Sequence, residues 1–361
     1  MFNDEELALL WFDYNDVNFS KTEKILEKFD KIDHIFDKNI VKSAIFKNED
    51  LKLIKEKLLN LDKEKFLETI LDEFYKYNIS AVTFVSKNYP DKLKNISDSP
   101  LVLYTRGDVS LLSKKSISIV GTRKPTMYGK IVCEKFTKVL SNAGLVTVSG
   151  LAYGIDTCVA NTTIDEKGKT IAVLAGGLDS IYPSSNKGLA DRIVETGGLL
   201  ISENRPSIKP LGYSFINRNR IVSALGLGTL IIEAGKTSGT MATARHALEQ
   251  GRELFVVPGN INSPESEGTN NLIDEMPDTF TICPERILYR LKIKKKTEEK
   301  PAVQVNLTEN LILDVLSKGE ISFDELSEKT NIKPAELSAV LIKLEMFGLV
   351  MKGPSNTYYK I

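Results

Sequence analysis

Six short, almost uninterrupted apolar segments constrain the fold of this chain more than any other feature. They read SISIVG, LVTVSG, KTIAVLAGG, GLLISE, GTLIIEAG and RELFVVPG, and all lie between residues 116 and 259. Helical patterns such as GKIVCEKFTKVLSNAG separate several of them. Apolar runs that do not alternate with polar residues predict strands buried on both faces, and interleaved helices predict parallel pairing. We therefore expect a doubly wound, mostly parallel α/β sheet, with ligands at the carboxyl ends of its strands.

The patterns outside this region predict further domains. Apolar residues spaced by three and four, with lysine and glutamate between them, predict helices near the N-terminus. These helices would form a small bundle of the SAM or helix-hairpin-helix type, although the glycine hairpin of the latter is missing. The predicted organisation is an N-terminal helical domain over 1–82, a Rossmann-like core over 83–291, a charged linker over 292–304 and a winged helix over 305–361.

The C-terminal pattern is three helices followed by a hairpin, LVMKGPSNTYYKI, which is typical of a winged helix. Residues 305–361 carry six Lys/Arg and eight Asp/Glu, a net charge of −2. That charge disfavours phosphate binding, so a protein-contact or packing role is the better interpretation. The preceding KIKKKTEEK is interpreted as a linker, with a basic tail as the alternative.

The composition excludes several classes of function. Lysine plus arginine equals aspartate plus glutamate at 48 each, so any anion site must be local. Three widely separated cysteines and two histidines are too few for a zinc site, and we expect neither a metal nor a cofactor. The acidic start MFNDEELALLW is unlike a secretory signal, and no apolar run is long enough to span a membrane. We expect a cytoplasmic protein whose three cysteines are buried free thiols.

The loops after the predicted strands share one chemical character. They are rich in glycine and small residues, which let backbone N–H groups approach a ligand, and several open a helix. Arginine and lysine side chains add cationic donors that match phosphate oxygens. Residues 201–240 contain five Lys/Arg and two Glu, a local net charge of +3. These loops predict an anion site formed by Gly121, Thr122, Arg123, Lys124, Ser149, Gly150, Gly154, Arg218, Asn219, Arg220, Lys236, Ser238, Gly239 and Thr240.

Two familiar nucleotide motifs are absent. EAGKTSGT contains a GKT, but the glycine that a P-loop needs five residues before Gly235 is replaced by Leu230. GLGTLI begins like a dinucleotide fingerprint, yet its third glycine is Ile231 and the segment enters a strand.

Two acidic residues are candidates for organising the site. Asp156 is interpreted either as part of the site or as an ordinary helix-start carboxylate. Glu233 is interpreted either as a catalytic carboxylate or as the partner that holds Arg218 or Arg220. We favour the second role for Glu233, because acid–base catalysis usually recruits a second titratable group. Phe215 directly precedes the arginines and is the preferred base-stacking candidate.

The same motifs resemble a known family. VGTRKPTMYG, SGLAYGID, KTIAVLAGGLDSIYP, FINRNRIVSALG, EAGKTSGTMATA and ELFVVPGNINSPESEGTN occur in the order typical of the DprA/Smf family. The resemblance covers roughly residues 85–280 and rests on several independent motifs. Two positions depart from the family pattern: Ala160 stands near a usual histidine, and Asp274 stands near a usual basic residue.

The resemblance implies a non-enzymatic protein that binds single-stranded DNA during natural transformation. It also implies protection of the strand, loading of the RecA recombinase and a homodimer formed through the Rossmann-like domain. By motif position, it implies that most of the predicted anion-site residues, together with Phe215, contact the strand.

Two rival functions stay open. Phosphoribohydrolases and sensors of NAD-derived nucleotides share the fold superfamily, but their PGGxGTxxE loop is represented here only by VPGNINSPESEGTNN. A scaffold acting through its terminal domains is the third possibility. The length of the preferred ligand distinguishes these hypotheses. A strand-binding groove should bind several nucleotides more tightly than one, and its affinity should fall steeply as the salt concentration rises.

Overall fold

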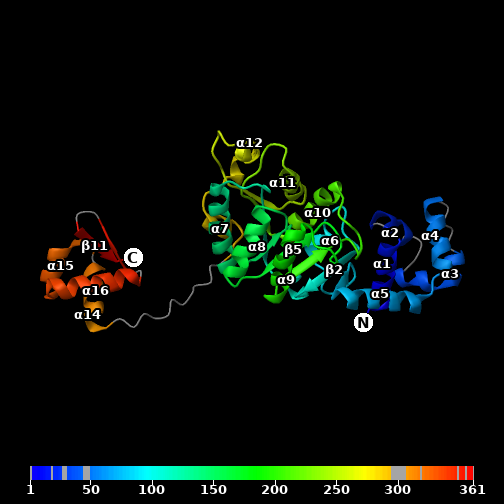
Figure 1. The fold of residues 1–361 in the computed structure, drawn as a ribbon, viewed down its shortest axis with the longest axis horizontal. Coiled ribbons are helices and arrows are strands. Elements are labelled where there is room, and N and C mark those ends of the chain that lie inside the picture. Colours follow the sequence, from blue (N-terminus) through cyan, green and yellow to red (C-terminus); the bar gives the residue numbers. More distant parts are fainter. Residues whose placement is uncertain are drawn as a thin grey trace. The chain divides into compact units, whose positions relative to one another are not determined.

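A computed structural model describes residues 2–17, 19–26, 31–43, 49–293, 306–317, 319–347, 349–353 and 356–360. The chain divides into two compact units at residues 296 and 297 (Figure 1). The predicted linker over 292–304 falls almost entirely outside the described residues. The predicted boundary at residue 82 stays a prediction, because the N-terminal helices belong to the same unit as the sheet.

The centre of the first unit is an eight-stranded sheet in the order β1-β2-β6-β5-β4-β3-β7-β8. The six strands from β6 to β8 pair in parallel, whereas β1 and β2 add an antiparallel edge. This confirms the predicted doubly wound, mostly parallel sheet. The strands are β1 (Ser80–Thr83), β2 (Val102–Gly107), β3 (Ser116–Val120), β4 (Val146–Ser149), β5 (Thr170–Leu174), β6 (Leu199–Ser202), β7 (Gly228–Ile231) and β8 (Glu253–Val256).

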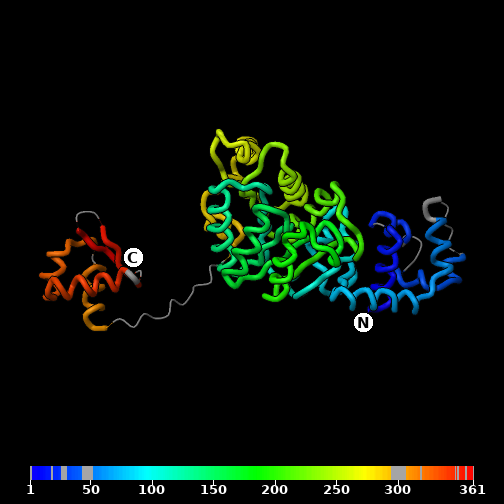
Figure 2. Tube along the Cα trace, in the orientation of Figure 1, coloured from blue at the N-terminus to red at the C-terminus, as the bar shows by residue number. Residues whose placement is uncertain are grey.

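Helices cover both faces of the sheet, as continuous apolar strands require. On one face Ile117 and Ile119 of β3 pack against α7 and α8. On the other face Val120 packs with residues of α10 and α11. Figure 2 shows the chain running from α5 directly into the β1 edge. The helices of this unit are α1 (Asp4–Tyr14), α2 (Phe19–Leu26), α3 (Lys38–Ser43), α4 (Glu49–Leu59), α5 (Lys63–Tyr77), α6 (Asp91–Lys94), α7 (Met127–Asn142), α8 (Ile155–Asp165), α9 (Lys187–Glu195), α10 (Gly212–Leu225), α11 (Gly239–Glu249), α12 (Glu267–Glu275) and α13 (Pro284–Arg290).

The second unit has its own apolar core and confirms the predicted winged helix. Ile312, Leu326, Leu337 and Leu344 from its three helices pack with Val350 of the wing. Its elements are α14 (Leu307–Leu316), β9 (Ile321–Ser322), α15 (Phe323–Thr330), α16 (Pro334–Met346), β10 (Val350–Lys352) and β11 (Thr357–Lys360).

The lysine of the helix that usually reads DNA is already paired. Lys343 Nζ in α16 donates to the buried Glu309 carboxylate of α14 at 2.7 Å. This ion pair leaves Lys343 less available for a phosphate than its position suggests. The observation favours the interpretation of this domain as a protein-contact or packing module.

A buried polar contact joins α1 to the antiparallel edge of the sheet. Tyr104 Oη donates to Asp13 Oδ2 at 2.6 Å, and Arg205 Nη1 donates to the Asp13 carbonyl oxygen at 3.0 Å. Burial raises the pKa of Asp13 from 3.8 to about 6, because the loss of hydration outweighs the hydrogen bond from Tyr104.

This shift predicts how pH affects stability. The folded protein holds the Asp13 proton more tightly than the unfolded chain. The contribution of Asp13 to the free energy of unfolding therefore declines as pH rises from about 4 to about 6. Asp13→Asn keeps an acceptor for Tyr104 and removes the buried charge. We expect the variant to be more stable than the wild type at neutral pH, by at most about 3 kcal/mol. Urea unfolding at about pH 4 should show that the difference has disappeared; an equal difference at both pH values would contradict the role of the proton.

Nowhere in the described ranges does a helix have the length and apolar character that crossing a bilayer requires.

Candidate nucleic-acid interface

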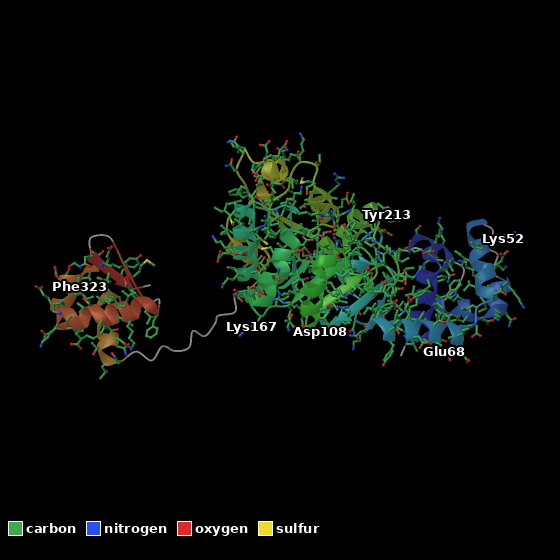
Figure 3. All side chains as sticks on the ribbon, viewed as in Figure 1. Lys52, Glu68, Asp108, Lys167, Tyr213 and Phe323 are labelled. Atoms are coloured by element: carbon green, nitrogen blue, oxygen red, sulfur yellow. The ribbon has the colours of Figure 1, made fainter. Side chains whose placement is uncertain are left out.

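An open groove of about 610 Å³ lies at the carboxyl ends of the parallel strands. It is formed by the loops after β3 and β4, the start of α10 and the loop between β7 and α11. The helix α10 lies beside α11, and Figure 3 labels the exposed Tyr213 in the first turn of α10. The structure brings into this groove the predicted residues Gly121, Thr122, Arg123, Lys124, Gly150, Asp156, Phe215, Arg218, Asn219, Ser238, Gly239 and Thr240.

The loop from β3 to α7 presents two open cations to this groove. Arg123 and Lys124 are exposed, and no carboxylate of the described chain lies within ion-pair distance of either. The Arg123 guanidinium lies over the Phe215 ring at 5.2 Å, and Tyr182 packs beside that ring at 5.4 Å. One face of Phe215 is therefore covered by a cation, so any base that stacks there shares the ring with Arg123.

A buried carboxylate holds this loop in place. Glu233 is 1% exposed and accepts hydrogen bonds from Thr126 N at 2.9 Å and Thr126 Oγ1 at 2.6 Å. The backbone of Glu233 also accepts from Thr122 N at 2.7 Å. The prediction that Glu233 holds Arg218 or Arg220 is therefore wrong. Glu233 instead fixes the loop that carries Arg123, because that loop ends at the cap of α7 directly above the β7 strand end.

Arg218 is buried instead of facing solvent. It is 4% exposed, and its Nη1 donates to Gly150 O at 2.8 Å and to Val173 O. Burial lowers the pKa of Arg218 to about 10, while the nearby Asp156 opposes that change, so the side chain is charged at neutral pH. Its Nη1 is occupied by these two backbone carbonyls, and its Nε donates to Asn219 Oδ1 at 3.3 Å. Arg218 therefore contributes a fixed positive charge beneath the groove and ties α10 to the ends of β4 and β5.

Asp156 organises the loop between β4 and α8. Its Oδ2 accepts from Gly150 N at 3.1 Å and Ala152 N at 3.2 Å. Burial raises the pKa of Asp156 above its ordinary value, although Arg218 and these backbone donors act in the opposite direction. Both interpretations of this residue thus describe one arrangement, in which a helix-start carboxylate shapes the loop that lines the groove.

The start of α11 forms the remaining wall. Ser238 caps this helix by accepting from Thr240 N at 3.2 Å, and Gly239 follows with open space around its Cα. The first N–H groups of a helix have no intrahelical partner, and its dipole favours an anion there. Asn219 Nδ2 donates to Gly239 O at 3.3 Å and so links this terminus to α10.

Besides Glu233, four predicted residues lie outside the groove. Ser149 is buried and donates to Ile119 O at 2.9 Å. Lys236 is exposed and lies 3.7 Å from a Glu267 carboxylate oxygen. Gly154 lies beneath the Thr122–Arg123 peptide and borders a neighbouring groove. The fourth, Arg220, is described next.

Arg220 lies in a different pocket and forms a bidentate ion pair with Glu203. Its Nη1 and Nη2 lie 3.0 and 2.6 Å from the two carboxylate oxygens, and its Nε donates to Asp98 O at 3.0 Å. Sequence reasoning missed Glu203 as its partner. The signal was present, since Glu203 ends an apolar strand as Glu233 does. Two strand-end acids and two arginines cannot be paired without the tertiary structure, however.

The thiols were expected to be buried, which holds for Cys133 alone. Cys158 and Cys283 are half-buried, and Cys158 faces a groove between α7 and α8.

Comparison with known proteins places this site in a family. The model of the DNA recombination-mediator protein A family matches residues 80–292, and that of the DprA winged helix domain matches residues 296–356. The DNA processing protein DprA of Bacillus subtilis is 42% identical over 244 residues, which are 64% of this chain and 82% of that protein.

Two solved structures are similar in fold. That of DNA processing protein A from Streptococcus pneumoniae matches with a TM-score of 0.66 and 31% identity, over 80% of this chain and 98% of its own. That of the Helicobacter pylori DNA processing protein A concerns that protein's single-stranded DNA binding mode. It matches with a TM-score of 0.54 and 32% identity, over 59% of this chain and 95% of its own.

Proposed function

This chain belongs to the DNA recombination-mediator protein A family, and from that premise we propose that it binds single-stranded DNA in the groove at the strand ends. One observation carries the proposal. Arg218 and Arg220 are both occupied by protein partners, whereas Arg123 and Lys124 stand open beside a helix N-terminus. Open cations and backbone donors along a groove match a sugar–phosphate backbone.

The two carboxylates singled out in the sequence, Glu233 and Asp156, support a binding role instead of a catalytic one. Glu233 and Asp156 are buried, and each accepts two hydrogen bonds from neighbouring protein groups. Both therefore act on the shape of their loops. A general acid or base needs access to the substrate proton, which such commitments oppose.

The biological role proposed is the processing of DNA in natural transformation. In this role the protein protects an incoming strand, loads RecA onto it and works as a homodimer in the cytoplasm. The family membership supports these finer proposals, as does the paired Lys343 of the winged helix, which favours a protein partner there. A strand-exchange assay with RecA and a coated strand tests the loading step, and unchanged RecA activity in the presence of this protein would argue against it.

The binding proposal predicts the effect of removing the open cations. Arg123→Ala/Lys124→Ala should weaken binding of labelled oligo-dT. It should also reduce the slope of log K against log salt by roughly 1.4, at about 0.7 per phosphate contact on single strands. Fluorescence anisotropy at several salt concentrations measures both quantities.

The matched control is Lys114→Ala/Lys115→Ala. It removes two exposed lysines that precede β3, at the opposite end of the strand from the groove, and should leave the slope unchanged. A wild-type protein that binds no oligonucleotide of any length would contradict the proposal. Saturation by a mononucleotide would favour a nucleotide-binding role instead.

A further inference from the structure

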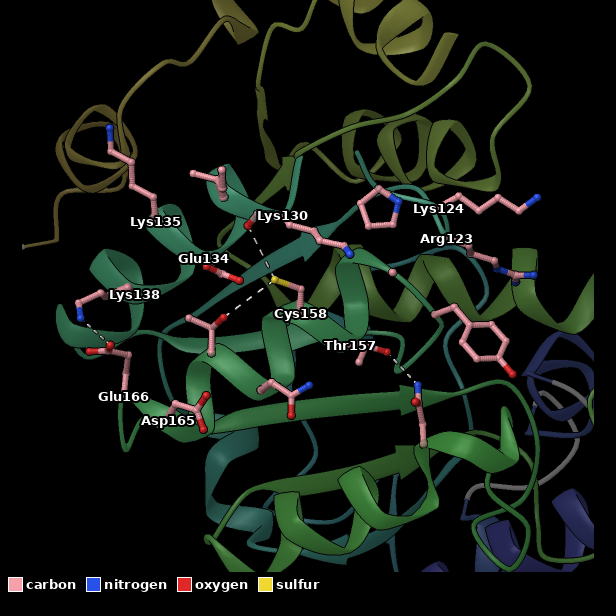
Figure 4. A pocket seen from close by; sticks show the side chains of 17 residues that line it. Arg123, Lys124, Lys130, Glu134, Lys135, Lys138, Thr157, Cys158, Asp165 and Glu166 are labelled. Carbon is pink, nitrogen blue, oxygen red and sulfur yellow. Dashed lines mark hydrogen bonds and ion pairs between the residues drawn. The ribbon is translucent and has the colours of Figure 1, made fainter. Parts of the chain in front are cut away.

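A second, larger groove of about 1230 Å³ runs between α7 and α8 (Figure 4). Its walls reach from Lys130 to Lys138 along α7, which is about 12 Å at the rise of an α-helix. Its floor is formed by short polar side chains of α8, among them Thr157, Cys158 and Thr162. An elongated groove of this kind suits a chain-like ligand better than a compact one.

This second groove is continuous with the groove at the strand ends. Arg123 and Lys124 line both of them. At the junction stands Tyr153, whose side chain is 49% exposed, on the loop that leads into α8. A strand held at Arg123 therefore meets the second groove without leaving the protein surface.

The charges along the second groove favour an anion. Five cationic and three acidic residues line it, a net charge of +2 in a chain whose total charge is zero. Two of the acids are occupied: Glu166 lies 2.7 Å from Lys138 Nζ, and Asp165 lies 3.6 Å from Arg192. The third is Glu134, next to Lys135 on α7.

Two lysines of α7 remain open. In the part of the chain that the structure describes, no carboxylate lies within 4 Å of Lys130 or Lys135. Figure 4 shows the Lys130 side chain extending from α7 toward the Arg123 side of the groove. The exposed Ile131 stands between these lysines in the sequence and offers an apolar contact for a base or sugar.

From this geometry we infer that the α7–α8 groove is a second segment of the single-stranded DNA path. The strand passes from the strand-end groove over Arg123 and Tyr153, and Lys130 and Lys135 bind its phosphates farther along. The inference rests on the proposed function and extends it, because it assigns binding of longer strands to residues outside the family motifs.

The test compares oligo-dT of increasing length on the wild type and on Lys130→Ala/Lys135→Ala. Short strands that fill only the strand-end groove should bind both proteins equally. Longer strands should bind the variant several-fold more weakly, and their salt slope should fall by roughly 1.4 for the two lost phosphate contacts. Lys114→Ala/Lys115→Ala again removes the same charge elsewhere and should change neither quantity.

Each possible outcome has a distinct meaning. Equal weakening of short and long strands would overturn the inference, since it would show a general electrostatic effect and no second segment. Unchanged binding of long strands would overturn it as well. Failure of the wild type to bind any strand would instead contradict the proposed function itself.

Cys158 offers an independent readout, because its half-buried thiol lies in the floor of the second groove. A Cys283→Ser variant keeps two cysteines, Cys133 and Cys158. Cys133 is fully buried, so Cys158 is the accessible thiol in this variant. Long oligo-dT should slow alkylation of Cys158 by a small maleimide, and short oligo-dT should leave the rate unchanged. Equal rates with and without bound long strands would place the strand elsewhere and overturn the inference.

Discussion

Replacing Arg218 by alanine will lower the free energy of unfolding of the first unit by about 3–5 kcal/mol, because it leaves a buried carboxylate without its cation. Arg218 is 4% exposed, and Asp156 beside it is 7% exposed. The substitution also removes the donor to Gly150 O and Val173 O. Urea unfolding followed by circular dichroism measures the change.

A double-mutant cycle identifies the cause of this loss. Asp156→Asn removes the negative charge and keeps an acceptor for the N–H groups of Gly150 and Ala152. In that background Arg218→Ala should cost clearly less than in the wild type, because no uncompensated charge remains. Equal costs in both backgrounds would show that the lost carbonyl contacts dominate and that the charge pair is unimportant.

This prediction bears on how DNA binding should be tested. An Arg218→Ala/Arg220→Ala protein would lose both a buried cation and the bidentate partner of Glu203. Its loss of affinity would report a damaged fold, and no conclusion about phosphate contacts would follow. The variants at Arg123 and Lys124 avoid this difficulty, because both side chains are exposed.

Replacing Gly154 by alanine is expected to disturb both the fold and the groove. Gly154 has a φ of +79°, and an added Cβ would lie 2.4 Å from Thr122 O and 2.6 Å from the Arg123 carbonyl carbon. The unfavourable backbone conformation costs about 1–3 kcal/mol and the overlap about 1–3 more, so the unfolding free energy should fall by about 2–6 kcal/mol. Because the overlapping atoms are backbone, the Arg123 loop must move, and oligo-dT binding should weaken at least tenfold.

Gly188 provides the matched control for this glycine. It lies in α9, its φ is not positive, and a Cβ there would meet nothing within 4 Å. Gly188→Ala should therefore be neutral or slightly stabilising and should bind oligo-dT normally. If Gly154→Ala kept wild-type stability and affinity, the close contact between the α8 start and the Arg123 loop would have no role in the groove.

The structure also separates two kinds of residue within the conspicuous FINRNR segment. Phe215 and Asn219 face the strand-end groove, whereas Arg218 points beneath it and Arg220 turns toward Glu203. A helix places successive residues about 100° apart, so residues two positions apart lie on different faces. The count of cations in this segment therefore overestimates the charge that a ligand meets at the groove.

The amino-acid sequence by itself determined the architecture and the edge of the sheet at which the site lies. Continuous apolar strands and interleaved helices require a parallel sheet buried on both faces, and parallel strands place all their carboxyl ends together. Small residues and cations after β3, β4 and β7 consequently had to converge. These conclusions depend on local patterns of apolar, small and charged residues, which can be read along the sequence.

Only the tertiary structure decided which charges meet a ligand and which are used inside the protein. Arg123 and Arg218 are equally cationic in the sequence, yet Arg123 is exposed whereas Arg218 is buried, with only 4% of its surface exposed. Likewise, Glu233 and Glu203 both follow apolar strands, but Glu233 holds the loop before α7 and Glu203 holds Arg220. Such pairings join residues up to 107 positions apart. They depend on distances of a few ångströms across the sheet, which no local pattern encodes, because the energy of a charge is set by its neighbours in space and by its access to water.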